Sequence, residues 1–366
     1  MALDRPATEI PSETTSQQDN WSGQTPRALG YRMPAEWEPH AATWLSWPHK
    51  EASWPGNFTP IPRLYAHLVR TLARHEPVHI LAGGESLFPE VSRLFQNQSR
   101  VTVHDVRTDD AWLRDSGPIF LNGKPGAPPA LINWGYNAWG GKYPPYELDD
   151  LLPTEIAALT GRNKFTPGII LEGGAIDVNG RGTLITTEQC LLNPNRNPHL
   201  DRASVEKYLT DYLNVTNILW LGAGIVGDDT DGHIDELARF VNPTTVVAAV
   251  EEDPTDENYA ALQDNLRRLK SFSDQDGQPL TIIPLPLPRA MDYEGQRLPA
   301  SYCNFYIANG AVLVPQFGDP ADHAALDILR PLFPGREVLG LFARELAWGL
   351  GAFHCITQQE PRLAGG

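Results

Sequence analysis

The chain has little cysteine: its 366 residues include three, at positions 190, 303 and 355. Three widely separated cysteines cannot form a disulfide framework, which favours a reducing compartment, so we expect a cytoplasmic protein. Long apolar runs are also missing, because none reaches the roughly 18 residues that a membrane-spanning helix requires. The N-terminus has neither the basic start nor the apolar middle of a secretory signal. The sequence therefore predicts no membrane partner.

Basic residues are scarce as well. Lys and Arg number 29 against 45 Asp and Glu, which gives a formal net charge of −16. Such a charge repels nucleic acid and attracts small cations, and no cluster of Lys or Arg opposes it, so we expect no nucleic-acid partner. Net acidity also favours solubility, so it supports a cationic ligand only where acids gather in a pocket.

Residues 1–30 are rich in Ser, Thr, Gln and Pro and also carry acidic residues. We interpret them as a disordered leader. The 33 prolines and 31 glycines are spread along the chain rather than clustered, so no linker divides the remainder. Residues 31–366 are therefore expected to form one domain with a substantial core.

Strand-like runs alternate with amphipathic helical stretches, a pattern that indicates an α/β protein. Examples of the expected strands are Val78–Leu81, Ile119–Leu121, 169–171 and Thr245–Val250, and examples of the expected helices are 62–74, 199–213 and 256–272. Polar segments near residues 115, 172, 233, 304 and 355 each adjoin an expected strand. We infer repeated units that direct their strand ends toward one centre, although no clean sequence repeat is present.

Cys355 lies near the end of the chain in the stretch LGAFHCITQQ, residues 350–359. A lone cysteine is usually a small buried hydrophobic residue. Its flanking Gly, His and Gln residues do not suit an apolar core, so we interpret Cys355 as a presented nucleophile. Cys190 and Cys303 lack such neighbours, and we interpret both as structural.

The densest acidic segment is GDDTDGHID, residues 227–235. Its histidine, His233, could protonate a departing amine and then deprotonate a water molecule. His233 and Asp235 are two residues apart, so on a strand both side chains would face the same way. Carboxylates here could hold a guanidinium or ammonium group through paired hydrogen bonds. Thiol, imidazole and carboxylates together indicate attack on a positively charged carbon.

Two other interpretations fit this region less well. His and Asp are common metal ligands, but a zinc site would consume the thiol as a ligand, and no HxH or CxxC spacing is present. GAGIVG, residues 222–227, matches the dinucleotide fingerprint of an NAD-dependent dehydrogenase, but acidic residues follow where a helix should begin. We therefore expect no metal and no organic cofactor.

Three further segments carry polar residues beside expected strands. Trp112 could stack on a flat cation while Asp115, three residues later, accepts hydrogen bonds from it. Glu172, which two glycines follow, could orient His233 as carboxylates do in catalytic triads. Asn304 offers a neutral donor near a substrate. Each segment alone is weak evidence for a functional site, but the presence of all three together is stronger evidence.

These motifs, in this order, resemble the agmatine deiminase / bacterial peptidylarginine deiminase-like family of the pentein superfamily. The resemblance extends from Arg32 to Pro361 and rests on MPAEWEPH (33–40), WLRDSGP (112–118), NWGYNAWGGKY (133–143), EGG (172–174), DDTDGHID (228–235), NF (304–305) and HCITQQ (354–359). It implies a five-fold pseudosymmetric α/β propeller, the pentein fold, in a single catalytic domain over residues 31–366. It also implies deimination without metal or organic cofactor.

The resemblance assigns roles residue by residue. It implies that Cys355 is the nucleophile, that His233 is the general acid and base, and that Glu172 is the orienting carboxylate. Asp115 and Asp235 resemble the pair that grips a guanidinium. The residues that would line the substrate channel are Trp112, Asp229 and Asn304.

Two departures from the family pattern are visible. Glu236 stands where relatives often carry Asn, and Ala352 and Phe353 replace a more glycine-rich approach to the cysteine. We expect both at the rim of the site, where they would bear on specificity rather than on reaction type.

The expected function is hydrolysis of agmatine to N-carbamoylputrescine and ammonia through an amidino-cysteine intermediate, a step of putrescine and polyamine biosynthesis. The expected partner is thus a small cationic guanidino substrate. Alternatives are a peptidylarginine or free-arginine deiminase, an amidinotransferase, or a non-catalytic guanidine-binding protein. A homodimer is expected only because symmetric assemblies are common.

Overall fold

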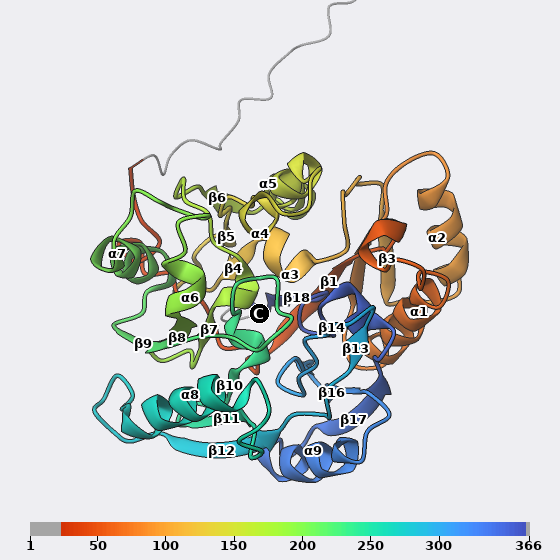
Figure 1. Cartoon of the computed structure of the whole chain (residues 1–366). Coiled ribbons are helices and arrows are strands. Elements are labelled where there is room, and N and C mark those ends of the chain that lie inside the picture. Colours follow the sequence, from red (N-terminus) through yellow and green to blue (C-terminus); the bar gives the residue numbers. More distant parts are fainter. Residues whose placement is uncertain (1–22, 364–366) are drawn as a thin grey trace, which may run out of the picture.

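The computed structural model describes residues 23–363 (Figure 1). Residues 1–22 of the expected leader lie outside the described part. Residues 26–30 form turns, and the backbone amide of Arg27 donates to the carbonyl oxygen of Asp211 at 3.0 Å. Within residues 23–363, no helix is long and apolar enough to cross a membrane.

Most strands belong to five sheets that share one pattern. In each sheet a middle strand pairs antiparallel with one neighbour and parallel with the other. With the middle strand second, the sheets are β18 (Gln358–Pro361), β1 (His40–Ser46) and β2 (Val78–Leu81); β4 (Ile119–Leu121), β5 (Ala130–Ile132) and β6 (Asn163–Phe165); β7 (Asp177–Val178), β8 (Thr183–Thr187) and β9 (Asn217–Leu221); β10 (Ala238–Asn242), β11 (Thr245–Val250) and β12 (Thr281–Pro286); and β15 (Tyr306–Ile307), β16 (Ala311–Gln316) and β17 (Glu337–Phe342). β3 (Val101–His104) extends the first sheet, and β13 (Asp292–Tyr293) and β14 (Gln296–Arg297) form a separate hairpin.

Helices connect the parallel strands of each sheet, because a parallel pair requires a crossover. The crossovers are α1 (Ile61–Leu72) from β1 to β2, α2 (Leu87–Phe95) from β2 to β3, α4 (Ala138–Gly141) and α5 (Glu147–Thr160) from β5 to β6, α6 (Glu188–Leu191) and α7 (Arg202–Leu213) from β8 to β9, α8 (Tyr259–Ser271) from β11 to β12, and α9 (Ala321–Leu329) from β16 to β17. The longer helices lie around the outside, and the sheets follow one another around the molecule in chain order (Figure 1). The predicted α/β class is confirmed.

Helix α7 illustrates how the sequence sets an element's bounds. The side chain of Asp201 accepts a hydrogen bond from the backbone amide of Ser204 at 2.9 Å, which caps the first turn. Asn214 ends the helix in the left-handed conformation, with a φ of 58°. Val205 and Leu209 face the core.

A short turn precedes the antiparallel strand of every sheet. Three of these turns are the helices α3 (Leu113–Ser116), η3 (Gly173–Ala175) and η4 (Ile234–Glu236), which lead into β4, β7 and β10. Turns at residues 302–303 and 353–356 lead into β15 and β18. The five turns carry or adjoin all predicted site residues except Asp229, so the repeated topology explains why chemistry-bearing residues recur along the chain.

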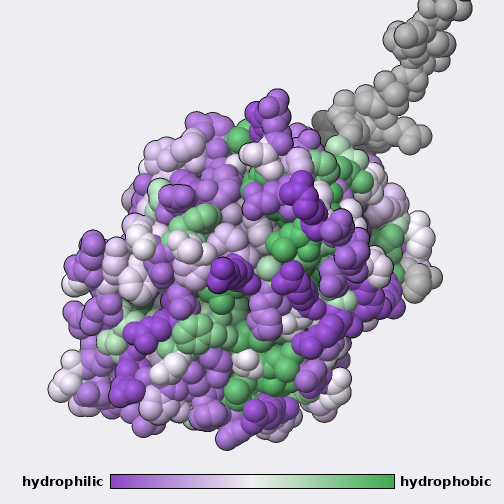
Figure 2. All heavy atoms as spheres, turned by 90° about the vertical axis from the view of Figure 1, so that its right-hand side faces the viewer, coloured by the Kyte–Doolittle hydropathy of each residue, from purple (hydrophilic) through white to green (hydrophobic). Residues whose placement is uncertain are grey.

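The side of the molecule that bears α1 and β17 is largely hydrophilic, with apolar patches between the charged side chains (Figure 2). A groove of about 430 Å³ between these two elements is lined by Leu64, Leu341 and Phe342 among others. None of its lining residues is a cysteine. It therefore lacks the predicted nucleophile.

Candidate active site

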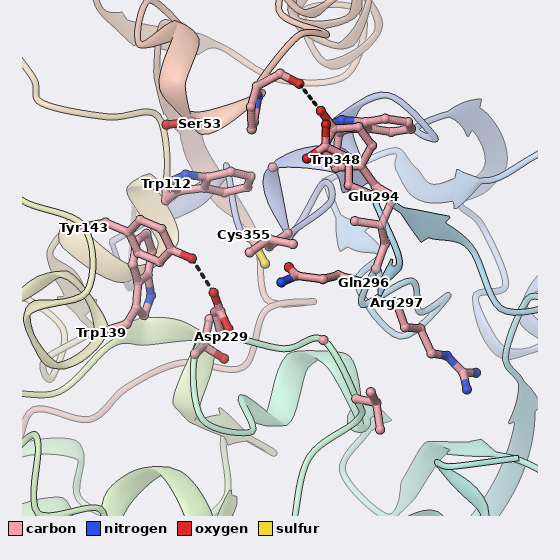
Figure 3. Close-up of a pocket in the computed structure, with 18 of the residues that line it drawn as sticks. Ser53, Trp112, Trp139, Tyr143, Asp229, Glu294, Gln296, Arg297, Trp348 and Cys355 are labelled. Atoms are coloured by element: carbon pink, nitrogen blue, oxygen red, sulfur yellow. Dashed lines mark hydrogen bonds between the residues drawn. The ribbon is translucent and has the colours of Figure 1, made fainter.

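Four predicted residues, Trp112, Asp115, Asp229 and Cys355, line one cavity of about 770 Å³ (Figure 3). Among residues 23–363, six carboxylates line it, from Asp110, Asp115, Asp229, Glu257, Asp292 and Glu294, against a single basic side chain. That side chain, Arg297, donates to both oxygens of Asp256 at 2.8 and 2.9 Å and points away from Cys355 (Figure 3). We call this space the acidic cavity. Lys50 lies 3.3 Å from one of these carboxylates, that of Asp110, and the excess of acidic over basic groups that remains favours a cation.

Aromatic rings form part of the cavity wall. Trp112 and Trp139 both line it, and Trp112 packs against Trp54 with ring centroids 5.4 Å apart. A Cβ atom at Gly351 would lie 2.6 Å from the Trp112 ring and 3.1 Å from the sulfur of Cys355. Glycine at this position therefore allows the ring and the thiol to lie side by side.

Asn304 fixes the turn that carries Cys355. Its Oδ1 accepts hydrogen bonds from the backbone amides of Ala352, His354 and Cys355 at 3.2, 3.0 and 3.3 Å. Its Nδ2 donates to Cys355 Sγ at 3.0 Å and to Glu236 Oε1 at 2.7 Å. Asn304 is fully buried and is absent from the lining of the acidic cavity. Asn304 therefore holds the thiol and its turn in place, and its expected contact with a substrate stays a prediction.

Two carboxyl groups lie next to the thiol of Cys355. Its Sγ is 3.6 Å from Asp235 Oδ2 and 3.9 Å from Glu236 Oε1. Burial, followed by these two carboxyl groups, raises the pKa of Cys355 well above its usual value. Burial and the charge of Asp235 likewise raise the pKa of Glu236 well above its usual value. The cation-free site therefore favours a protonated thiol.

The expectation that Glu236, Ala352 and Phe353 lie at the rim is wrong. Glu236 is 3 % exposed and, through Asn304, shares a hydrogen-bond donor with Cys355. Ala352 and Phe353 are each 3 % exposed. The departure from Asn at position 236 thus falls beside the thiol of Cys355, because η4 places that residue one position after Asp235 inside the core.

His233 directly precedes η4, at its N-cap, and is 1 % exposed. The prediction that His233 and Asp235 share one face of a strand is wrong, because Asp235 lies inside the 3₁₀ helix η4 and His233 is the N-cap of that helix. The Nδ1 atom of His233 lies 3.7 Å from Asp115 Oδ1. Burial alone would lower the pKa of His233, but Asp115 and Cys190 outweigh burial and raise that pKa well above its usual value.

Gly174 brings these groups together. A Cβ atom at this position would lie 2.5 Å from His233 Nδ1, 2.7 Å from Asp115 Oδ1 and 3.1 Å from Asp235 Oδ2. The same Asp235 oxygen is the one 3.6 Å from Cys355 Sγ. The predicted acid–base histidine and both predicted guanidinium ligands are thus gathered around one glycine, and one of those ligands, Asp235, adjoins the thiol.

Asp115 is held by two donors. Its Oδ1 accepts from the backbone amide of Gly174 at 2.9 Å, and its Oδ2 accepts from Trp139 Nε1 at 3.0 Å. Burial raises the pKa of Asp115 to about 6, although the nearby His233 opposes that rise. Trp139 was not among the predicted residues, although it lies in the 133–143 segment.

Glu172 lies beside His233, but its hydrogen bond goes to Arg196. Its Oε1 accepts from Arg196 Nε at 2.6 Å, while its Oε2 has no hydrogen-bond partner among residues 23–363. Ligand atoms of Glu172, Cys190 and His233 all lie within 4.8 Å of one another. Cys190 therefore adjoins the site, so our purely structural interpretation of that residue was incomplete.

Arg196 and His354 are the main residues that sequence reasoning missed. Arg196 Nη1 donates to Asp231 Oδ2 at 2.6 Å and so ties the acidic loop to Glu172. His354 lies between two carboxylates, with Nδ1 2.7 Å from Asp235 Oδ2 and Nε2 2.8 Å from Glu36 Oε2. The position of His354 directly before the cysteine was the one available signal.

Asp229 lies at a different place from the other predicted acids. It lines the acidic cavity, and its Oδ2 accepts a hydrogen bond from the hydroxyl of Tyr143 (Figure 3). Lys142, the residue before that tyrosine, donates to Asp231 Oδ1 at 2.8 Å. Residues 142–143 and the 229–231 loop therefore meet at the cavity, which is consistent with a substrate-lining position for Asp229.

Residues 32–361 match the family model of the Porphyromonas-type peptidyl-arginine deiminases. The chain belongs to this family. Among its relatives, agmatine deiminase of Pseudomonas aeruginosa strain LESB58 is 41% identical over 360 residues, which cover 92% of this chain and 97% of that protein. The agmatine deiminase of Stutzerimonas stutzeri strain A1501 is 40% identical with the same coverage.

Solved structures of family members share the fold. The agmatine deiminase of Enterococcus faecalis superposes with a TM-score of 0.88 at 34% identity, covering 93% of this chain and 99% of that one. A cysteine-to-serine variant of C. jejuni agmatine deiminase with substrate bound gives a TM-score of 0.84 at 30% identity, covering 91% and 97%. The mixed α/β architecture is therefore that of this deiminase family.

Family membership leaves no support for the dehydrogenase alternative. Residues 222–227 lie in coil and turn after β9, and η4 is the next helical element. Asp228 accepts from the backbone amides of Gly232 and His233 at 3.0 and 3.1 Å. The glycine-rich segment thus shapes the acidic loop and opens no phosphate-binding helix.

Proposed function

We propose that the protein is an agmatine deiminase, which hydrolyses agmatine to N-carbamoylputrescine and ammonia in putrescine formation. The observation that carries this proposal is the buried thiol of Cys355 beside an acid-lined cavity, with His233, Asp115 and Asp235 gathered around Gly174. Relatives that are 38 to 41% identical over most of the chain are agmatine deiminases, which supports the choice of substrate.

The proposed binding step places the guanidinium against Asp115 and Asp235. Planar N–H groups suit paired hydrogen bonds to carboxylates, and Asp235 Oδ1 is a buried oxygen without a partner among residues 23–363. Trp112 offers an aromatic face to the same flat cation. The positive charge then offsets the buried carboxylates that keep Cys355 protonated, so substrate binding favours the thiolate, and the thiol proton is released to solvent.

In the proposed first half-reaction, the Cys355 thiolate adds to the guanidinium carbon. The tetrahedral adduct collapses as His233, in its charged form, gives its proton to the leaving nitrogen, and ammonia departs. An amidino-thioether remains on Cys355. The raised pKa of His233 supports this step, because it keeps the imidazole protonated at neutral pH.

In the proposed second half-reaction, neutral His233 takes a proton from a water molecule as the water attacks the amidino carbon. As the new adduct collapses, its hydroxyl group loses the remaining proton to solvent, the C–S bond breaks, the thiolate is regenerated and the ureido product is released. Glu172 and Asp115 would stabilise the charged imidazole, since both lie near it. No metal or organic cofactor takes part.

Peptidylarginine or free arginine is the competing substrate class, which the name of the family model favours. Agmatine ends in an amine, whereas free arginine adds a carboxylate. Six carboxylates line the acidic cavity and its one arginine is paired with Asp256, so a substrate carboxylate would be repelled. We expect kcat/KM for agmatine to exceed that for free arginine by at least about 100-fold, which is about 2.7 kcal/mol.

A substrate panel tests this choice. Ureido product would be measured for agmatine, arginine and an arginine-containing peptide, with ornithine added in one arm as an amidino acceptor. Preferential turnover of arginine or the peptide would reject the agmatine assignment. Transfer to ornithine without ammonia release would indicate an amidinotransferase, and no turnover with any substrate would indicate a binding protein.

We also propose that the five sheets are related by a pseudo-five-fold axis, because each repeats the same strand pattern and leads in with a site-bearing turn. A single catalytic domain over residues 31–366, a disordered leader, a cytoplasmic location and a homodimer remain predictions. Sedimentation equilibrium tests the dimer, and a monomer at micromolar concentration would reject it. Limited proteolysis tests the domain: a stable fragment much shorter than 31–366 would contradict it.

A further inference from the structure

A second free thiol lies deep beside the proposed acid–base histidine. Cys190 is fully buried in the short helix α6. Thr187 caps this helix, and its hydroxyl oxygen accepts a hydrogen bond from the backbone amide of Cys190 at 3.2 Å. Its sulfur, a nitrogen of His233 and a carboxylate oxygen of Glu172 lie within 4.8 Å of one another. Three different turns thus deliver a thiol, an imidazole and a carboxylate to one point.

The same cluster contains buried polar atoms whose bonding capacity is unused. Among residues 23–363, neither ring nitrogen of His233 has a well-aligned hydrogen-bond partner, and Glu172 Oε2 has none either. His233 is 1 % exposed and Glu172 is fully buried. Buried polar groups normally find partners, so these atoms are available to a ligand.

The donor set is the one that zinc prefers. Thiolate, imidazole and carboxylate are all common zinc ligands, and three protein ligands leave a fourth position open. Zinc–ligand bonds of about 2.0–2.3 Å imply ligand atoms roughly 3.3–3.8 Å apart, so small side-chain shifts would close the cluster. Arg196 already orients Glu172 through Oε1, as outer partners of metal ligands commonly do.

A neighbouring cluster is a poorer site. Ligand atoms of Asp235, Glu236 and Cys355 also lie within 4.8 Å of one another, but no imidazole is among them. Asp235 Oδ2 is occupied by His354, and Asn304 donates to both Glu236 and Cys355. Metal binding there would break these hydrogen bonds.

We propose that Cys190, His233 and Glu172 form an inhibitory zinc site. The ion takes a ring nitrogen of His233 that proton transfer needs, so bound zinc lowers kcat until a chelator removes it. Zinc binding follows from the geometry of the cluster alone, whereas inhibition of the enzyme rests on the proposed role of His233.

Metal binding is tested first without turnover, in full-length Cys355→Ala. This variant lacks the reactive thiol, and it is expected to bind one Zn²⁺ per chain by equilibrium dialysis. Co²⁺ in the same variant should give the absorption of thiolate-to-cobalt charge transfer. Adding Cys190→Ala should weaken binding at least ten-fold and remove that absorption, whereas adding Cys303→Ala, a matched change of another buried free thiol, should leave both unchanged.

Inhibition is tested in variants that keep Cys355, and the turnover rate of each variant with Zn²⁺ is compared with its own rate in the absence of metal. Zn²⁺ should inhibit the unmodified chain and Cys303→Ala alike, and Cys190→Ala should raise the half-inhibiting concentration at least ten-fold. Cys190→Ser, closer in volume, serves if Cys190→Ala unfolds by circular dichroism. Metal binding that survives Cys190→Ala but disappears in Cys355→Ala would overturn the proposal, as would equal inhibition of all variants. Binding without any deiminase activity would instead reject the proposed function and leave the site intact.

Discussion

Gly174→Ala tests the convergence of groups around this glycine. The added methyl would lie 2.5 Å from His233 Nδ1, about 0.9 Å short of the 3.4 Å at which contact becomes ordinary. It would also crowd Asp115 Oδ1 at 2.7 Å and Asp235 Oδ2 at 3.1 Å. At least one of three reacting or binding groups must therefore move by several tenths of an ångström.

The expected result is a loss of function with little loss of fold. A misplacement of about 1 Å in an active site can cost about 100-fold in rate, so we expect kcat/KM for agmatine to fall about 100-fold, or about 2.7 kcal/mol. The backbone of Gly174 is not in the left-handed region, so alanine adds no conformational strain there. The thermal midpoint should change by only a few degrees.

Gly222→Ala is the matched control. Its added methyl would meet only the ends of the Asp264 and Arg268 side chains, at 3.2 and 3.4 Å, which can move. We expect this control to keep kcat/KM within about three-fold of the unmodified chain. If Gly174→Ala did the same, with agmatine turnover measured by ureido product, the gathering of catalytic groups at this point would be refuted.

Four further predictions concern individual side chains. Cys355→Ala should abolish ammonia release from agmatine and leave the circular dichroism spectrum unchanged. Retained turnover would contradict the proposed role of Cys355 as the nucleophile. His233→Ala should lower kcat by about 10²–10⁴, since acid–base groups supply that much, and a loss below ten-fold would contradict its role. The kcat/KM of the unmodified chain should fall below about pH 6, because Asp115, whose pKa is raised to about 6, is protonated there and no longer accepts from the guanidinium; an acid limb near pH 4 would contradict this. Asn304→Ala should shift iodoacetamide alkylation of Cys355 to higher pH, because the lost donor stabilises the thiolate, and an unshifted profile would show that it does not.

Strands with an apolar pattern could be predicted from the sequence. Val78–Leu81, Ile119–Leu121 and Thr245–Val250 form with the expected bounds. The strand expected at 169–171 is reduced to a bridge between Gly135 and Ile170. Local sequence was sufficient where a strand is buried on both faces and flanked by turn residues.

Strand β18 could not be predicted in this way, because its residues are largely polar. Gln358 Nε2 donates to the carbonyl of Pro118 at 2.8 Å, and Gln359 Oε1 accepts from Arg114 at 2.7 Å. These glutamines are buried because distant partners satisfy their polar groups. No apolar period signals such a strand.

The site shows the same division. Cys355 and His233 could be proposed from the sequence because each lies among residues that do not suit a core. The placement of Glu236 beside the thiol and of Cys190 beside His233 depends on how separate turns meet, which sequence spacing does not encode. Asn304 could also be proposed, but its hydrogen bonds to the backbone amides of the turn that carries Cys355 exist only in the fold.

The covalent role of Cys355 is tested most directly by intact-mass analysis of the protein after rapid acid quench during agmatine turnover. We expect a transient mass increase equal to agmatine less ammonia, which peptide mapping should place on Cys355. Product release without any protein adduct, or an adduct on Cys190 or Cys303, would contradict it.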